Sequence, residues 1–275
     1  MLLKHMKAWM MFLSIAMTAL VAAPLHAAED RLMLTGSSTI APLAQEIGKR
    51  FEKIHPGVRV DVQTGGSSRG VNDARMKVAD IGMASRALKP KEADLTPYTI
   101  ARDGISIILH KSNPVASLSD GQIIAIYTGK IRNWREVGGA DQPITVVNKA
   151  EGHSTLELFL HHFALKNSQV KAQAVIGDNE QGIKTVAGNP GAIGYVSIGT
   201  AEYEVEHRTP IKLLPMAGVT ATTEHVRDGS FPLSRPLNLV VKGQPSDLAQ
   251  RFIDFARSPK VNDLVKAQYF VPLGR

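Results

Sequence analysis

Residues 32–70 read LMLTGSSTIAPLAQEIGKRFEKIHPGVRVDVQTGGSSRG, and this stretch contains one strand–loop–helix unit and the strand and loop of a second, whose helix follows from Val71. A short apolar run ends at a Gly-Ser-Ser-Thr loop, after which apolar residues recur at helical spacing. Val58, Val60 and Val62 then alternate with polar residues, which is typical of a half-buried strand, and a second glycine-rich loop follows. The repeated order of strand, loop and helix predicts an α/β fold with largely parallel sheets.

The same alternation continues along most of the chain. Short apolar runs predict the strands, and apolar residues that recur at intervals of three and four predict the helices. By these patterns we expect strands at 80–83, 105–109, 144–147, 192–196 and 237–241, and helices at 156–163 and 248–255.

Two apolar strands, around 104–110 and 236–242, lie far apart in the sequence and have no obvious linker beside them. We interpret them as the crossings between two lobes. The first lobe would contain 28–105 and 238–275, and the second would contain 106–237. Chain length agrees, because removing 27 residues from 275 leaves 248, which suits two lobes better than one small domain.

The first 27 residues have the pattern of a secretory signal peptide. Lys4 and Lys7 give a basic start, and an apolar run precedes small residues around Ala27. We expect cleavage after Ala27 and a mature protein in the periplasm. An uncleaved anchor is the alternative, but the apolar run is shorter than the ~20 residues that a spanning helix needs. The chain has no cysteine, so we expect neither a lipid-anchored N-terminus nor disulfides.

The charge of the chain is moderately positive. Its 32 basic and 25 acidic side chains give a net charge of +7, which becomes +5 when Lys4 and Lys7 leave with the signal peptide. The basic residues are scattered, without the runs and interleaved aromatics of a nucleic-acid surface, so no nucleic-acid partner is expected. The excess would favour a small anionic ligand. An aromatic content of 5% argues against a sugar cleft lined by stacked rings.

Neither a metal site nor a catalytic centre stands out. His161 and His162 are adjacent on a predicted helix, so they face different directions and make a poor metal pair. The run 152–156 (GHSTL) resembles a nucleophile elbow, but its second glycine is missing. No pair of base and nucleophile is recognisable. We therefore expect a protein that is not an enzyme and that holds no metal and no cofactor.

Residues with binding chemistry concentrate where three of the predicted helices begin. The three loops are 35–39 (TGSST), 64–70 (TGGSSRG) and 151–155 (EGHST). The N-terminus of a helix has unpaired N–H groups and a partial positive charge, glycine lets the backbone come close, and Ser or Thr adds a hydroxyl donor. Three such loops converging in a cleft would bind an oxyanion. Each loop taken alone is better explained by ordinary helix capping, and only the three together favour a binding site.

A series of motifs resembles the phosphate-binding proteins of the ABC phosphate transporter, in the same order and over essentially the whole mature chain. The motifs are GSSTIAP at 36–42, GSSRG at 66–70, DIGMASR at 80–86, YTGKIRNW at 127–134, PGAIGYV at 190–196, LSRPL at 233–237 and FVPL at 270–273. The resemblance implies a two-lobed periplasmic binding protein of type II, with mixed, largely parallel sheets, that closes over dehydrated phosphate. It also implies an ABC permease complex in the inner membrane as partner, and we expect a monomer.

The resemblance further implies which residues bind the ligand. The first loop would supply Thr39 and the amide of Ile40, with Ser38 adjacent, and the second would supply Ser67, with Ser68 adjacent. The remaining expected ligand-binding residues come from the DIGMASR motif and the third loop: Arg86, Lys149, His153, Ser154 and Thr155.

The chain departs from the family pattern in two places, and both concern the identity of the ligand. The third loop usually reads Arg, any residue, acidic, Gly, Ser, Gly, Thr, whereas Lys149, His153 and Ser154 stand here. In some relatives an aspartate stands at the position of Arg86. That aspartate accepts the phosphate proton, and the site therefore rejects sulfate. The ligand could therefore be another tetrahedral oxyanion, such as arsenate, vanadate or molybdate. A sensor or adhesion-type protein on the same fold is the alternative to a transport role.

Overall fold

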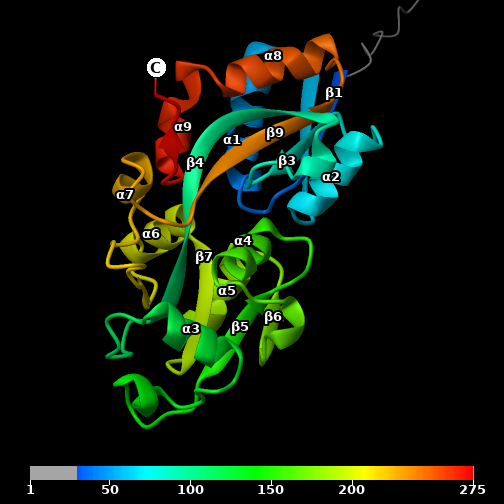
Figure 1. The fold of residues 1–275 in the computed structure, drawn as a ribbon. Coiled ribbons are helices and arrows are strands. Elements are labelled where there is room, and N and C mark those ends of the chain that lie inside the picture. The colour runs from blue at the N-terminus through cyan, green and yellow to red at the C-terminus, as the bar shows by residue number, and fades with distance from the viewer. Residues whose placement is uncertain (1–29, 275) are drawn as a thin grey trace, which may run out of the picture.

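Two long strands, β4 (Leu95–His110) and β9 (Ser234–Lys242), run through the centre of the molecule (Figure 1). They pair antiparallel from Leu95 opposite Lys242 to Gly104 opposite Ser234. Beyond Gly104, β4 continues into the other half of the molecule. The computed structural model describes residues 30–274, so the expected signal peptide lies outside the described residues.

The remaining strands extend this central pair in both directions. The order across the sheet is β2-β1-β3-β9-β4-β7-β5-β6, and β8 and β10 pair with β4. Pairing is parallel for β1 with β2 and β3 and for β5 with β6 and β7, and it is antiparallel around β4 and β9. The additional strands are β1 (Asp30–Gly36), β2 (Val58–Thr64), β3 (Ile81–Ala84), β5 (Thr145–Lys149), β6 (Ala174–Ile176), β7 (Ala192–Ser197), β8 (Ile211–Leu213) and β10 (Val271–Pro272).

Helices cover the strands in both halves, and most begin at polar caps. Side chains of Ser119, Asp178, Ser197, Thr222 and Ser246 accept hydrogen bonds from the first amides of their helices. The helices are α1 (Ala41–Ile54), α2 (Ser67–Arg75), α3 (Asp120–Tyr127), α4 (Ser154–His162), α5 (Asn179–Ala187), α6 (Ile198–Glu206), α7 (Thr223–Arg227), α8 (Asp247–Ala256) and α9 (Asn262–Ala267). Within 30–274, no helix is long and apolar enough to cross a membrane.

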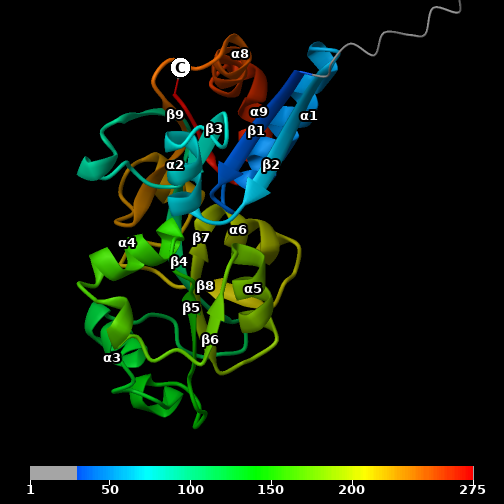
Figure 2. The same cartoon turned by 90° about the vertical axis from the view of Figure 1, so that its right-hand side faces the viewer.

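Each half has its own hydrophobic core. One core gathers buried residues from 32–101 and 237–270, among them Phe51 and Phe252, and lies between β1, β3, β9 and helices α1 and α8. The other gathers residues from 105–233 together with Val271. Figure 2 shows the two halves one above the other, with β4 passing between them. The structure thus confirms the predicted α/β, two-lobed architecture with a mixed sheet.

Candidate functional site

The three glycine- and serine-rich loops meet in the gap between the two halves. The first loop leads from β1 into α1, the second from β2 into α2, and the third from β5 into α4. Together with Ser85 they enclose a small space, lined by Ser37, Ser38, Thr39, Gly66, Ser67, Ser85, His153, Ser154 and Thr155. Its small size and its many hydroxyl groups suit a small inorganic ion rather than a sugar or peptide.

Direct hydrogen bonds across the gap show that the two halves are closed on each other. Ser67 Oγ donates to Ser154 Oγ at 3.1 Å, and Ser85 Oγ lies 2.5 Å from the same Ser154 oxygen. The amide of Ser68 donates to the carbonyl of Gly152 at 3.0 Å. Ser67 and Ser85 belong to the half that contains α2, whereas Gly152 and Ser154 belong to the half that contains α4. The second and third loops therefore form one continuous wall.

Glycine at position 66 allows this close approach. Gly66 has a φ of +87°, and a Cβ at this position would lie 2.7 Å from the carbonyl oxygen of Gly152. Any side chain would strain the backbone and push the third loop away. The glycine thus lets α2 begin directly against the opposite half.

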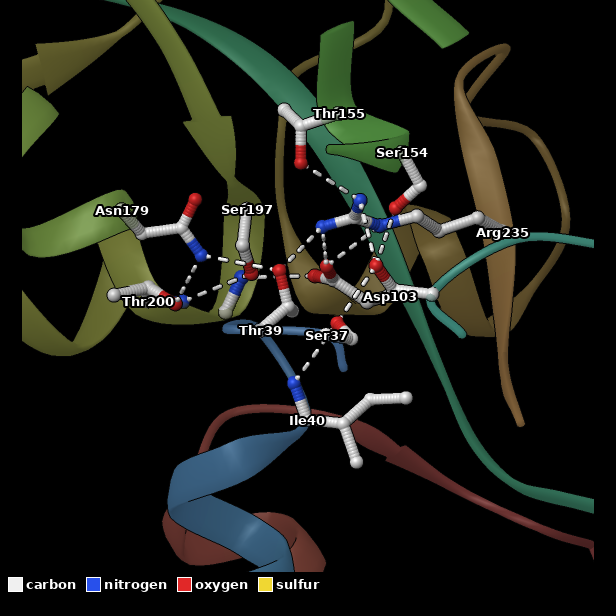
Figure 3. A network of polar contacts seen from close by, with 12 residues as sticks. Ser37, Thr39, Ile40, Asp103, Ser154, Thr155, Asn179, Ser197, Thr200 and Arg235 are labelled. Carbon is white, nitrogen blue, oxygen red and sulfur yellow. Dashed lines mark hydrogen bonds and ion pairs between the residues drawn. The ribbon is translucent and has the colours of Figure 1, made fainter. Parts of the chain in front are cut away.

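A buried ion pair between Arg235 of β9 and Asp103 of β4 forms the floor of the site (Figure 3). Arg235 Nη2 and Nε donate to Asp103 Oδ2 at 2.7 and 3.1 Å, and the side chains are 0% and 1% exposed. Arg235 also donates to Thr155 Oγ1 at 3.0 Å and to Thr39 Oγ1 at 3.3 Å. Its guanidinium therefore contacts hydroxyls from both halves beside the enclosed space.

The sequence alone predicts no role for Arg235 or Asp103; Arg235 stands in the LSRPL motif, and Asp103 belongs to none of the motifs above. A signal was present in the sequence, because each residue stands just before an apolar run, at 105–109 and at 237–241, and charged residues are almost never fully buried unless paired. The two residues stand directly opposite each other in the β4–β9 register, which only the structure reveals.

Lys149 lies behind the lining of the space rather than in it. The residue is 2% exposed, and its Nζ donates to Asn179 Oδ1 at 3.2 Å. Asn179 Nδ2 in turn donates to Thr39 Oγ1 at 3.3 Å, so the lysine reaches the first loop through this amide (Figure 3). Burial lowers the pKa of Lys149 to about 7; the charge of Asp178 raises it and the charge of Arg235 lowers it.

Arg86 is directed away from the enclosed space, although it was expected to contact the ligand. Its Nη1 and Nη2 donate to Glu92 at 2.7 and 3.0 Å, and its Nε lies 2.9 Å from Glu157 Oε2. This last contact is an ion pair without hydrogen-bond alignment, since neither atom has a hydrogen-bonding partner. The hydroxyl of Ser68 also donates to Glu157, at 3.0 Å. Both Arg86 and Ser68 thus contact carboxylates.

The other expected residues lie at or beside the space. Ser38, Thr39, Ser67, His153, Ser154 and Thr155 line it. The amide of Ile40 donates to Ser37 Oγ at 3.3 Å, so that hydroxyl is held by the start of α1 (Figure 3). For His153, burial lowers the pKa, the charge of Lys149 lowers it further and Asp178 opposes both. These effects together favour the neutral form of the imidazole.

The lining has the chemistry that a small anion requires. Among its nine residues, seven carry hydroxyl groups, and none carries a carboxylate. The floor adds the guanidinium of Arg235, and helices α1, α2 and α4 all begin here. Fixed donors and helix N-termini stabilise negative charge in a closed, water-poor site.

Comparisons with known proteins give a consistent result. The profile of the PBP superfamily domain matches residues 22–260. The phosphate-binding protein PstS of Bacillus subtilis is 28% identical over 252 residues, which cover 90% of this chain and 82% of the relative.

Two solved structures show the same relationship. A protein described as a phosphate ABC transporter substrate-binding protein of Clostridium perfringens, with bound phosphate, is 35% identical with a TM-score of 0.81. The alignment covers 89% of this chain and all of that one. An ABC-type phosphate transport receptor of Vibrio cholerae is 28% identical with a TM-score of 0.71, again over 89% of this chain and all of that one.

The two-lobed fold and the hydroxyl-lined space between the lobes define a solute-binding protein of the type II periplasmic class. The chain belongs to the PBP superfamily and, within it, to the PstS-like phosphate-binding proteins, as its motifs predicted. These relatives are named for binding and transport and not for a reaction, in agreement with the expectation that the chain is not an enzyme.

Proposed function

We infer that this protein captures inorganic phosphate, one ion per molecule, in the space enclosed by the three loops. The observation that carries this inference is the hydroxyl-rich lining, without a carboxylate, above the buried Arg235. Hydroxyl groups can both donate to and accept from phosphate, so they suit an ion that still carries a proton. Ser38, Thr39, Ser67, Ser154 and Thr155 would contact the ion directly. Lys149 would act through Asn179.

We further propose that the protein delivers phosphate to an ABC permease complex from the periplasm, after cleavage following Ala27. Family membership supports this role. The lobes would contain 28–105 with 238–275, and 106–237, and would move about the crossing of β4 and β9. The two largest hydrophobic cores support such a division, because they share no residue; Val271 of the C-terminal segment packs in the core of the second half.

Isothermal titration calorimetry on refolded, phosphate-stripped protein tests the function. We expect tight one-to-one binding of phosphate without turnover, and separate titrations with arsenate, sulfate and molybdate define selectivity. Folded protein that produces no heat with phosphate would contradict the proposal. Tighter binding of another anion in the panel would reassign the ligand.

A further inference from the structure

Glu157 connects the two lobes outside the enclosed space. It stands in the first turn of α4, on the third-loop side, with its side chain 24% exposed. Its carboxylate contacts three groups from the opposite lobe. Ser68 Oγ donates to Oε1 at 3.0 Å, while Arg86 Nε and Lys89 Nζ lie 2.9 and 2.8 Å from Oε2.

Arg86 has a second carboxylate partner within its own lobe. Glu92 accepts hydrogen bonds from both Arg86 Nη atoms and from the amide of Lys89, and the side chains of Arg86 and Glu92 are 4% and 5% exposed. This pair can persist when the lobes separate, because all its members lie between 86 and 92. The contacts to Glu157 cannot persist, because they join α4 to α2 and to the segment after β3.

We propose that Glu157 is a positioning residue that holds the second loop against the third only in the closed form, and so sets how long a captured anion stays bound. The inference rests on the proposed function for its ligand. Contacts made only in the closed state shift the open–closed equilibrium toward closure and slow ligand release. The carboxylate does not line the space, so it acts without touching the anion.

Phosphate association and dissociation rates for the native protein and Glu157→Gln test the proposal. Glutamine keeps the shape of the side chain and removes its charge, so we expect dissociation about tenfold faster, the size of one lost charge-assisted contact. The association rate should change by less than about twofold, because diffusional encounter precedes closure. Added sodium chloride should speed release from the native protein and leave the variant less affected.

Two further variants separate a specific role from general damage. Glu46→Gln removes an exposed carboxylate that pairs with Lys49 within α1, and it should leave both rates unchanged. Lys89→Met should speed release in the native background and have little effect in the Glu157→Gln background, because the two residues act through one contact. Equal dissociation rates for native and Glu157→Gln proteins, or additive effects of the two substitutions, would overturn the proposal.

A measurement without ligand distinguishes failure of this inference from failure of the proposed function. The chain has no cysteine, so spin labels at Lys53→Cys in α1 and Lys184→Cys in α5 report the separation of the lobes. We expect Glu157→Gln to shift the ligand-free distance distribution toward longer values. If the native protein does not bind phosphate but Glu157→Gln still shifts the ligand-free distances, only the proposed function is refuted. Identical distributions would refute the role of Glu157.

Discussion

At the scale of single residues, Lys149 determines the charge that the site offers to an anion. The charges of Arg235 and Asp103 balance in the buried pair, and those of Arg86 and Lys89 are matched by Glu92 and Glu157. The described part of the chain shows no ion pair to Lys149; its ammonium donates to an amide oxygen. Asp178 acts electrostatically on Lys149 without forming an ion pair with it, so the net charge beside the space changes with the protonation of this lysine.

Phosphate affinity should consequently fall as pH rises above about 7, where Lys149 loses its proton in the ligand-free protein. A bound anion stabilises the charged lysine and raises its pKa, so binding takes up a proton in this interval. Calorimetry from pH 6 to 9 on native protein and Lys149→Arg checks this, since arginine stays charged throughout. Relative to the variant, native affinity should drop by up to about tenfold per pH unit. The titration of phosphate itself affects both proteins equally, and parallel curves would contradict the expectation.

The same lowered pKa has a consequence for the ligand-free protein. The pKa of Lys149 is about 7 in the folded chain, against an ordinary value of 10.5. Between these values the unfolded chain binds more protons than the folded one. This residue therefore makes stability rise with pH through that window, and its destabilising effect is fully present below pH 7.

The hydroxyl groups of Thr39 and Ser67 should each contribute strongly to affinity. Both line the space, and each would donate a charge-assisted hydrogen bond worth about 1.5–3 kcal/mol. Thr39→Ala and Ser67→Ala are therefore expected to weaken phosphate binding by roughly ten- to a hundredfold in calorimetry. Thr185→Ala is the matched control, because its hydroxyl donates to Gln181 O within α5, away from the space. Losses no larger than the control's would exclude these hydroxyls as ligands.

At the scale of elements, α2 is held in place by a glycine that faces two strands. A Cβ on Gly70 would lie 2.6 Å from Thr35 O and 2.7 Å from Met83 O, which are backbone atoms of β1 and β3. Gly70→Ala should therefore displace α2, which begins at Ser67, and lower both thermal stability and phosphate affinity. Gly121→Ala tests specificity, since only Ser119 Oγ lies within 4 Å of that Cβ. Alanine in α3 should be neutral or stabilising by up to about 1 kcal/mol. Equal melting temperatures for the two variants would contradict this packing argument.

The loops of the site could be predicted from the sequence, whereas the charged pairs around them could not. The loops were recognisable because glycine and hydroxylated residues mark helix starts locally. The ten expected ligand residues came from the resemblance to the family, and six of them line the space. The orientation of Arg86 could not be predicted, because a sequence does not show that Glu92 and Glu157 approach it. Arg235 and Asp103 were missed because their partnership depends on the register of two strands more than a hundred residues apart. Local patterns thus identified the loops, whereas long-range pairing decided which charges face them.

At the scale of the whole molecule, the ion pair at the floor of the site lies at the crossing of β4 and β9, about which the two halves would close. Asp103 and Arg235 are paired in register immediately before Gly104, where β4 leaves β9 for the second half. Arg235 donates to Thr39 and Ser85 on one side and to Thr155 on the other. The same guanidinium therefore contacts both lobes at the point about which they would turn. An anion bound beside it would favour the closed arrangement through contacts to both sides.

Ligand-dependent closure should be visible in solution. The closed form encloses the space with hydrogen bonds between Ser67 and Ser154 and between Ser68 and Gly152. An anion could enter only when these bonds open, so the ligand-free protein must sample a more open arrangement. Small-angle scattering of phosphate-stripped protein should give a larger radius of gyration than the same sample saturated with phosphate. The Glu157→Gln variant should have a still larger radius of gyration without ligand. At saturating phosphate it should close like the native protein, because abundant ligand compensates for a weakened closed state. A profile that is unchanged between stripped and saturated protein would show that the lobes do not move, and the ion would then have to enter through the loops themselves.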